Sequence, residues 1–288
     1  TAFRAFGALG PENAVESITA LERCPGGSTG AKFFLTLTYS KPDPSLETRL
    51  FVKFSRDFAD AHRDHPGRYE MAEEVPFMAI ARDPSFPIAT AKPYFADYQM
   101  ETGTGLTITE CVTFGQNGIE PHRGKCLDFM TLDDPLPYYR AIVTGLARLC
   151  GAHKAGNLPV ETDTLFPFDP IAGSADLIRG DAASLERKLT RLREFVQACS
   201  QHFPDRVRTD SFLDTLADGA RTLRDMETDI RDWLIHDPKL IALCHWNAHV
   251  DNSFFWREDG ELHCGFIDWG RVGQITLGSA LWGALSAA

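Results

Sequence analysis

The feature that most constrains the fold is the segment from Leu243 to Gly270, near the end of the chain. An apolar run ending at Cys244 leads into a loop rich in polar side chains, and a second apolar run ends at Asp268. Short apolar runs between polar loops are typical of buried strands. We therefore predict strands over residues 240–244 and 262–267, adjacent to each other, so that polar side chains at their ends meet.

Asn252 and Asp268 are the two side chains that this arrangement would bring together. An amide oxygen and a carboxylate suit Mg²⁺, which takes one or two carboxylates and completes its shell with water and substrate phosphates. The segment thus predicts a magnesium site at Asn252 and Asp268. The alternative interpretation is an ordinary hairpin whose polar loop residues bond their own backbone.

The first part of the chain carries strand and turn signals. Runs rich in β-branched and aromatic residues predict strands, and the cluster Pro25–Gly30 predicts a turn between the first two. A helix is expected over residues 69–82, where Pro76 would kink or divide it. The predicted strands are 18–24, 33–39, 50–54, 88–91 and 106–112. Together they predict a small α+β lobe ending near residue 114.

The remainder of the chain is predicted to be mainly helical. Apolar residues at helical spacing indicate helices over 138–153, about 185–192 and 213–233, with a loop over 156–173. A chain of 288 residues is long for one compact core, so we expect two lobes. The expected domains are residues 1–114, which would bind a nucleotide, and residues 115–288, which would carry the catalytic and metal loops.

A lysine inside the third predicted strand is a candidate binding residue. Lys53 lies between Val52 and Phe54, and if it is buried there it needs an anionic partner. A lysine that points from an edge strand into solvent is the alternative. A strand lysine paired with a helix glutamate beside a glycine-rich turn is how kinase-type sites hold the phosphates of ATP. The helix that follows offers Glu70, Glu73 and Glu74.

Composition excludes several classes of protein. A formal net charge of -11 argues against sequence-independent nucleic-acid binding, which needs Lys and Arg against the phosphates. No apolar run approaches the roughly 18 residues that a bilayer span requires, so no membrane partner is expected. Seven scattered cysteines without a Cys-x-x-Cys pair indicate reduced, mostly buried thiols of a cytoplasmic protein and argue against a structural zinc site.

The order of these features resembles the aminoglycoside phosphotransferase and choline kinase superfamily, including its ecdysteroid-kinase-like branch. The family signature reads His-Gly-Asp-x-x-x-x-Asn, followed by Ile-Asp, then Trp or Phe, then Gly or Glu. Its positions are matched here by His245, Asn252, Asp268 and Trp269. Residues 146–153 are similar to a family helix, and residues 74–78 to its Glu-x-x-Phe-Tyr, which selects Glu74 among the three glutamates. The resemblance covers roughly residues 18–270.

The resemblance implies an α+β, bilobal protein-kinase-like fold with a small β-rich N-terminal lobe and a larger, mainly helical C-terminal lobe. ATP would lie in the cleft, Glu110 to Val112 would bind adenine, and Asn252 and Asp268 would hold Mg²⁺. The γ-phosphoryl group would pass to the hydroxyl of a small molecule. The residues implied in nucleotide binding are Gly27, Ser28, Gly30, Lys53, Glu74, Glu110 and Val112.

The chain departs from the family at its catalytic loop. Asn247 stands where the family has its catalytic aspartate, and Trp246 where it has glycine. An amide cannot accept a proton at neutral pH, and general-base assistance is typically worth about 10²–10⁴ in rate. Phosphoryl transfer depends mostly on positioning and charge neutralisation, so loss of the base need not abolish it.

Several interpretations of Asn247 remain open. Asn247 orients the acceptor hydroxyl in a slow kinase, or His249 or Asp251 serves as a substitute base. In a third interpretation the chain is a pseudokinase that binds a nucleotide or metabolite without transfer. An engineered Asp→Asn change would give the same sequence. A hydrolase is a further alternative, although no Gly-x-Ser-x-Gly elbow is present.

The two ends of the chain suggest a trimmed or shortened sequence. It begins at Thr1 instead of Met, and only residues 271–288 follow the second motif. The family usually continues with further helices that wall the acceptor pocket. We therefore expect a naturally reduced, trimmed or partial chain, and the sequence indicates neither the acceptor nor the oligomeric state.

Overall fold

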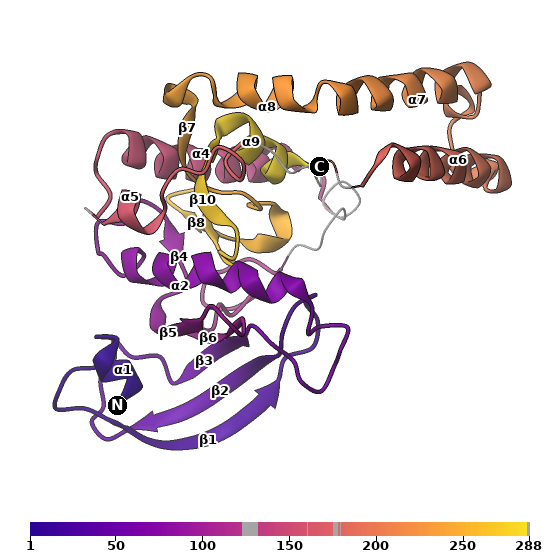
Figure 1. Ribbon diagram of the computed structural model, residues 1–288. Coiled ribbons are helices and arrows are strands. Elements are labelled where there is room, and N and C mark those ends of the chain that lie inside the picture. Colours follow the sequence, from indigo (N-terminus) through magenta and orange to yellow (C-terminus); the bar gives the residue numbers. More distant parts are fainter. Residues whose placement is uncertain (123–131, 160, 175–177, 179, 287–288) are drawn as a thin grey trace. The chain divides into compact units, whose positions relative to one another are not determined.

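The computed structural model describes residues 1–122, 132–159, 161–174, 178 and 180–286 (Figure 1). They form two compact units, one made of residues 1–169 with the chain from 239 onward, the other of residues 170–238. Residue 114 lies inside the first unit. The predicted boundary between the two lobes therefore falls within one compact unit, and it stays a prediction. Cys126, one of the cysteines expected to be a reduced thiol, lies outside the described residues.

The N-terminal part of the first unit is an antiparallel sheet with the strand order β1-β2-β3-β6-β5. Residues alternate between its faces, so Leu50 and Val52 of β3 are buried in the core on one face, whereas Lys53 lies on the other. A short helix, α1 (Ala2–Ala5), precedes the sheet. The strands are β1 (Val15–Arg23), β2 (Lys32–Tyr39), β3 (Arg49–Phe54), β5 (Pro93–Gln99) and β6 (Thr104–Glu110).

One predicted strand belongs to a different sheet. Residues 88–91 contribute β4 (Ala89–Thr90), which pairs in parallel with β9 (Glu261–Phe266), so its expected place in the N-terminal lobe is wrong. The fifth strand of the N-terminal sheet is β5, which was not predicted. Pro93 and Asp97 are poor strand formers in isolation, but β5 is an edge strand, where proline and charged residues are tolerated.

Helix α2 (Met71–Ile80) packs against the N-terminal sheet and follows the 3₁₀ turn η1 (Pro66–Glu70). It lies within the predicted range of 69–82. Pro76 lies inside α2, which continues through it as one helix, so the predicted division does not occur. The inward side of α2 carries Phe77 and also Glu74, both almost completely buried.

The rest of the first unit surrounds two small sheets. Strand β7 (Ile241–His245) pairs with β10 (Val272–Thr276), and β8 (Ser253–Glu258) pairs with β9 in an antiparallel hairpin. The predicted strands 240–244 and 262–267 therefore exist but are not neighbours, and the expectation that they pair is wrong. Short turns, η4 (Pro238–Leu240) and η5 (Val250–Asn252), precede β7 and β8, and the helices are α4 (Leu136–Lys154), α5 (Thr162–Leu165) and α9 (Leu277–Leu285).

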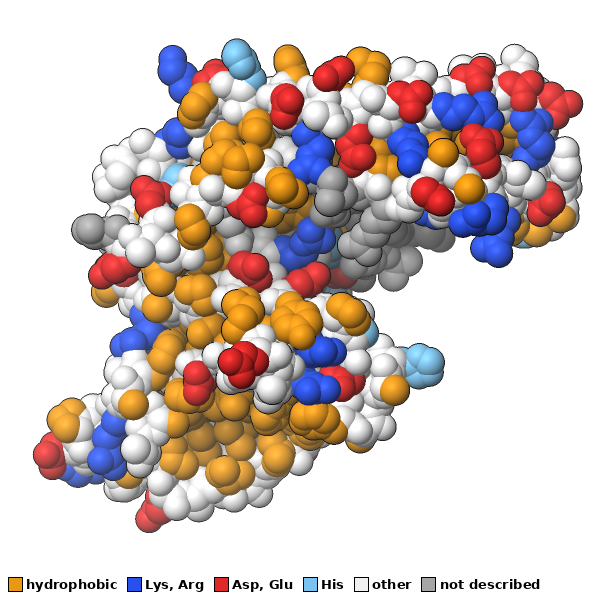
Figure 2. Space-filling model, in the orientation of Figure 1, with side chains coloured by type: hydrophobic (Ala, Val, Ile, Leu, Met, Phe, Trp, Pro, Cys, Tyr) orange, Lys and Arg blue, Asp and Glu red, His pale blue; other side chains and the backbone are white. Residues whose placement is uncertain are grey.

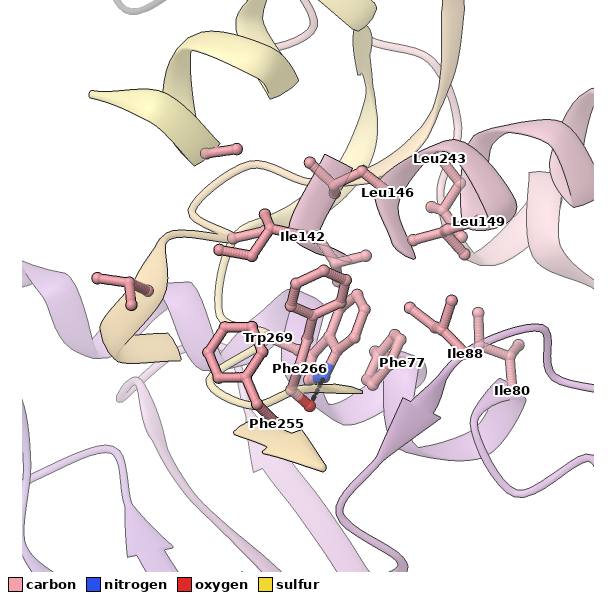
Figure 3. Packing of buried hydrophobic residues seen from close by; sticks show 14 of the residues in the cluster. Phe77, Ile80, Ile88, Ile142, Leu146, Leu149, Leu243, Phe255, Phe266 and Trp269 are labelled. Atoms are coloured by element: carbon pink, nitrogen blue, oxygen red, sulfur yellow. Dashed lines mark hydrogen bonds between the residues drawn. The ribbon is translucent and has the colours of Figure 1, made fainter. Parts of the chain in front are cut away.

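The core of this part joins α2, α4 and the β8–β9 hairpin (Figure 3). Trp269 is 1% exposed, and its ring stacks on that of Phe77 with centroids 3.8 Å apart. Its indole N–H donates to the Phe266 carbonyl at 3.2 Å and to the Thr90 hydroxyl at 3.0 Å. Trp269 therefore fixes the backbone that directly follows Asp268 against helix α2.

The second unit is helical, with α6 (Ala182–Ala198), α7 (Asp210–Asp225) and α8 (Glu227–Ile235) and the 3₁₀ turns η2 (Ser200–His202) and η3 (Asp205–Val207). The single helix predicted over 213–233 is two helices, because Met226 has non-helical backbone angles. Acidic and basic side chains are interleaved over these helices (Figure 2), and Arg221 of α7 bonds Glu186 of α6 through two N–H groups. Among the described residues no helix is long and apolar enough to cross a membrane.

The confirmed part of the fold prediction is its class. The chain is α+β, with an antiparallel sheet in the N-terminal part and mainly helices after it.

Candidate functional site

A cavity of about 440 Å³ lies in the first unit, between the N-terminal sheet and the start of the β8–β9 hairpin. It collects residues that are far apart in the sequence. The predicted site residues that line it are Gly27, Lys53, Glu74, Glu110, Val112, Asp251, Asn252 and Asp268. The predicted residues Ser28, Gly30, Asn247 and His249 do not line it.

The charged centre of the cavity is Lys53. Its ammonium donates to Glu74 Oε2 at 2.7 Å and to Asp268 Oδ1 at 2.5 Å. Lys53 and Glu74 are 14% and 4% exposed, whereas Asp268 is 51% exposed. Of the three glutamates considered on the helix, Glu74 is the one that contacts the lysine. The carboxylate of Asp268 is thus the member of this cluster that is open to a ligand.

The protonation of this cluster follows from its charges. Burial by itself lowers the pKa of Lys53, but the carboxylates of Asp268 and Glu74 outweigh it and hold that pKa above its usual value. The positive charge of Lys53 lowers the pKa of Asp268 to about 2. Burial raises the pKa of Glu74, and Lys53 opposes that rise. At neutral pH the cavity therefore presents a charged ammonium beside an ionised Asp268.

The backbone directs Asp268 into the cavity. Its φ is +64°, a left-handed conformation that is uncommon for residues other than glycine and is often found at functional sites. Ser253 pairs with Phe266 in the hairpin, and the Ile267 N–H donates to the Asn252 carbonyl at 2.9 Å. Asn252 and Asp268 come together because β8 and β9 pair, and not because of the two strands that were predicted to do so.

Asn252 and Asp268 fit the ligand requirements of Mg²⁺. The Asn252 side-chain amide donates from Nδ2 to the Asn247 carbonyl at 2.9 Å, which leaves Oδ1 as its only possible ligand atom. Within the described residues no group of three or more His, Cys, Asp or Glu is arranged to hold a metal ion. A site with one carboxylate and one amide oxygen therefore suits a cation that completes its shell with water and phosphates.

His245 supports the loop from within. It is completely buried, its Nε2 donates to the Ile267 carbonyl at 3.0 Å, and its Nδ1 accepts from the Asn247 N–H at 3.2 Å. Burial lowers the pKa of His245 to about 4. The two hydrogen bonds need a neutral ring with one N–H and one lone pair. His245 therefore acts as a neutral link between the loop at Asn247 and the backbone before Asp268.

Loss of stability at acid pH is the expected consequence. The folded pKa of His245 is about 4 and the unfolded value about 6.5, so between these the unfolded chain binds more protons and stability falls as the pH falls. His245 should lower the free energy of unfolding by about 2 kcal/mol when the pH falls from 7 to 5. Urea unfolding of wild type and His245→Gln at both pH values measures it. The same substitution at the exposed His236 is the control, and an unchanged pH dependence in His245→Gln would contradict the assignment.

The catalytic-loop candidates lie in different places. Asp251 lines the cavity and is 21% exposed, and its backbone carbonyl contacts His122 Nε2 at 3.1 Å. His249 is 3% exposed, and its Nδ1 contacts the Asp251 carboxylate. Asn247 is half-buried and does not line the cavity. Asp251 is therefore the only one of the three predicted catalytic residues that faces the cavity.

The predicted hinge forms one wall of the cavity. The Glu110 N–H donates to the Lys92 carbonyl at 2.8 Å, and the Cys111 N–H donates to the Arg49 carbonyl at 3.3 Å. These two amides are thus engaged within the protein. Val112 follows them and also lines the cavity.

Of the three predicted residues in the glycine-rich turn, only one lines the cavity. Gly27 lines the cavity beside Lys32, and an added Cβ there would lie 2.3 Å from the lysine ammonium. Ser28 instead uses its carbonyl to bond His65 Nε2 at 3.0 Å. Gly30 has a φ of +64°, and an added Cβ would lie 1.9 Å from the Phe54 carbonyl oxygen. Its lack of a side chain is therefore explained by the backbone alone.

Gly30→Ala is expected to destabilise the fold by about 2–4 kcal/mol, through the positive φ and the close contact with Phe54. The free energy of unfolding in urea measures the effect. Gly10→Ala is the matched control, because an added Cβ there meets nothing within 4 Å. Equal stability of the two variants would contradict the structural role of Gly30.

Several lining residues were not predicted. Lys32 pairs with Lys53 across β2 and β3, and its ammonium donates to the Thr29 carbonyl at 2.8 Å. Burial lowers its pKa, and Lys53 lowers it further. The alternation Lys32-x-Phe34 just after the turn was an available signal, since both side chains line the cavity. Phe51 also lines it and carries the same signal, because it stands two residues before Lys53 on β3, whereas Phe114 and His122 line it without a comparable signal.

Comparison with known proteins gives structural relatives only. No protein-family model matches the chain, and no curated protein sequence does so. Similar solved structures include a spectinomycin phosphotransferase in complex with ADP and spectinomycin, with 13% identity over 90% of this chain and 66% of that one, at a TM-score of 0.40. Another is an ethanolamine kinase of Plasmodium vivax, with 14% identity over 91% of this chain and 59% of that one, at a TM-score of 0.46.

A microcompartment-associated aminopropanol kinase is also similar, with 13% identity over 98% of this chain and 71% of that one, at a TM-score of 0.40. All three are described as phosphotransferases or kinases of small molecules. The chain spans 66% and 59% of the lengths of the first two. At this low identity, the chemistry of the site rests on its own residues.

Proposed function

We propose that this chain is an ATP- and Mg²⁺-dependent phosphotransferase that moves the γ-phosphoryl group of ATP to a hydroxyl of a small molecule. The observation that carries the proposal is the contact of Lys53 with both Glu74 and Asp268, in a cavity that Asn252 also lines. A plain hairpin would also bring Asn252 and Asp268 together. It would not explain why Lys53 of the N-terminal sheet and Glu74 of helix α2 lie beside them.

The cavity offers an apolar end and a charged end for the nucleotide. Phe34 and Phe51, with ring centroids 6.0 Å apart, line it together with Val112. We assign adenine to this end and its backbone contact to Val112, because the amides of the two residues before Val112 are engaged elsewhere. Lys32 and Lys53 would neutralise the phosphates at the other end, where positive charge is worth most in phosphoryl transfer.

Asn252 and Asp268 would hold Mg²⁺. The ion would supply charge neutralisation on the phosphate oxygens. Asp268 suits this role because Lys53 keeps it ionised and its carboxylate is half exposed. Trp269 and the β8–β9 pairing fix the positions of both ligands, so little reorganisation is needed when the nucleotide binds.

Asp251 is the side chain that we assign to the acceptor hydroxyl. The acceptor oxygen bonds the γ-phosphorus as the bond from that phosphorus to the β–γ bridging oxygen breaks, and ADP leaves. The hydroxyl proton passes to the Asp251 carboxylate. Asp251 faces the cavity next to Asn252, and its carboxylate contacts His249 on the side away from solvent. Asn247 would support the loop through its backbone contacts with His245 and Asn252.

A catalytically impaired kinase-like protein that binds a nucleotide or metabolite is the second candidate. It is favoured by one observation, the amide of Asn247 where a carboxylate is expected. Calorimetric titration of ATP with and without Mg²⁺, followed by transfer of labelled γ-phosphate over a panel of hydroxyl compounds, separates the two. Binding with transfer supports the phosphotransferase, and binding without transfer supports the impaired protein. Absence of ATP binding contradicts the phosphotransferase and restricts the impaired protein to metabolite binding.

A further inference from the structure

A second cavity, also of about 440 Å³, lies between helix α4 and the β8–β9 hairpin, and it shares no lining residue with the nucleotide cavity. We call it the arginine groove. Its principal side chains are Arg140, Ala141, Thr144, Arg148, Arg257 and Glu261. Three arginines and one glutamate give the groove a local positive charge, although the formal net charge of the whole chain is -11.

One wall of the groove is a stripe along α4. Arg140, Thr144 and Arg148 are four residues apart, so they lie on the same side of the helix. Eight residues correspond to about 12 Å along the axis, with Thr144 midway between the two arginines in the sequence. Among the residues that the structure describes, the side chain of neither Arg140 nor Arg148 forms an ion pair or hydrogen bond, and both side chains are exposed.

The other wall is the far end of the hairpin. Residues two apart on a strand share a face, so Arg257 lies on the side of β8 that also carries the buried Phe255, toward α4. Its Nε contacts Glu120 Oε1 at 3.3 Å, which holds the guanidinium in place. Between the walls α4 packs closely on β9, because an added Cβ at Gly145 would lie 2.9 Å from the Phe266 ring.

We propose that the arginine groove binds a small molecule carrying two or more phosphate or carboxylate groups. Guanidinium groups bind such oxyanions through paired N–H donors, and two of the three here have no protein carboxylate to satisfy them among the described residues. The volume is that of a small-molecule site. The proposal is independent of the phosphotransferase activity, because the groove lies outside the nucleotide cavity.

The test is calorimetric titration with inorganic tripolyphosphate in the absence of Mg²⁺. Wild type is expected to bind one equivalent, and Arg140→Ser/Arg148→Ser is expected to bind at least about tenfold more weakly. Thr144→Phe fills the groove without changing its charge and is expected to weaken binding as well. These three residues are exposed, so the thermal unfolding midpoint should not move.

Two further variants test whether the binding is specific to the arginine groove. Arg187→Ser/Arg191→Ser removes the same charge from exposed positions of α6, and its affinity should equal that of wild type. Lys53→Met removes one of the two lysines that line the nucleotide cavity and should also keep the affinity. The proposal is wrong if wild type does not bind, if the Arg140/Arg148 variant binds as wild type does, if the α6 variant loses as much, or if binding disappears only in Lys53→Met.

Discussion

Asp268→Ala is expected to abolish Mg²⁺-dependent binding of ATP and to lower any phosphoryl transfer by about 10³-fold or more. Asp268 is the one half-exposed carboxylate beside Lys53, and that lysine keeps it ionised far below neutral pH. Without it the cavity keeps Asn252 as its only proposed metal ligand. Titration of ATP into wild type and variant, each with and without Mg²⁺, measures the effect directly.

The control is Asp232→Ala, which removes the same side chain from an exposed position of helix α8. It is expected to bind and transfer as wild type does. The far-ultraviolet circular dichroism of both variants should match that of wild type, because Lys53 keeps its contact with Glu74 when Asp268 is lost. Unchanged Mg²⁺-dependent binding in Asp268→Ala would remove the basis of the proposed function.

The second large effect concerns Asp251. Asp251→Asn keeps the shape of the side chain but removes its capacity to accept a proton, so kcat should fall by about 10²–10⁴ with little change in ATP affinity. A fall in kcat without a change in binding distinguishes a chemical role from a structural one. Single-turnover transfer together with calorimetric binding of ATP measures both quantities on the same preparation.

Asn247→Asp is the informative partner of that variant. If Asp251 accepts the proton, a carboxylate at position 247, which does not line the cavity, should raise kcat by no more than a few-fold. A rise of about 10² or more would show that the natural chain lacks its base, and the impaired-kinase alternative would then be preferred. Full activity of Asp251→Asn would contradict the role assigned to Asp251.

The strands of the N-terminal sheet were largely predictable because their signal is local. Strands β1, β2, β3 and β6 overlap predicted runs of β-branched and aromatic residues. The missed strand β5 begins with proline and contains an aspartate, which only its edge position tolerates. Sheet membership was not predictable, since the residues of β4 pair with residues 176 positions further along the chain.

For the segment from Leu243 to Gly270, the predicted proximity of Asn252 and Asp268 is correct, but the strand pairing predicted to produce it is wrong. Asn252 and Asp268 do come together, but β8 brings them together by pairing with β9, while β7 pairs with β10. The aromatic run 254–256 of β8, which directly follows the polar loop, was not predicted as a strand. The sequence limited which residues could come together, and the pairing of the strands decided which of them do.

What the sequence by itself determined is the set of chemical groups and their order: a strand lysine, helix glutamates, and a loop and strand end carrying Asn252 and Asp268. Side-chain periodicity also determined which residues share a face of a strand or helix. Only the tertiary structure decided which face meets which partner. Packing brought Glu74, which the family resemblance had already selected, to Lys53, turned Asp251 and not Asn247 to the cavity, and set the arginines of α4 opposite Arg257. The physical reason is that these choices depend on contacts between elements distant in sequence, which local patterns do not encode.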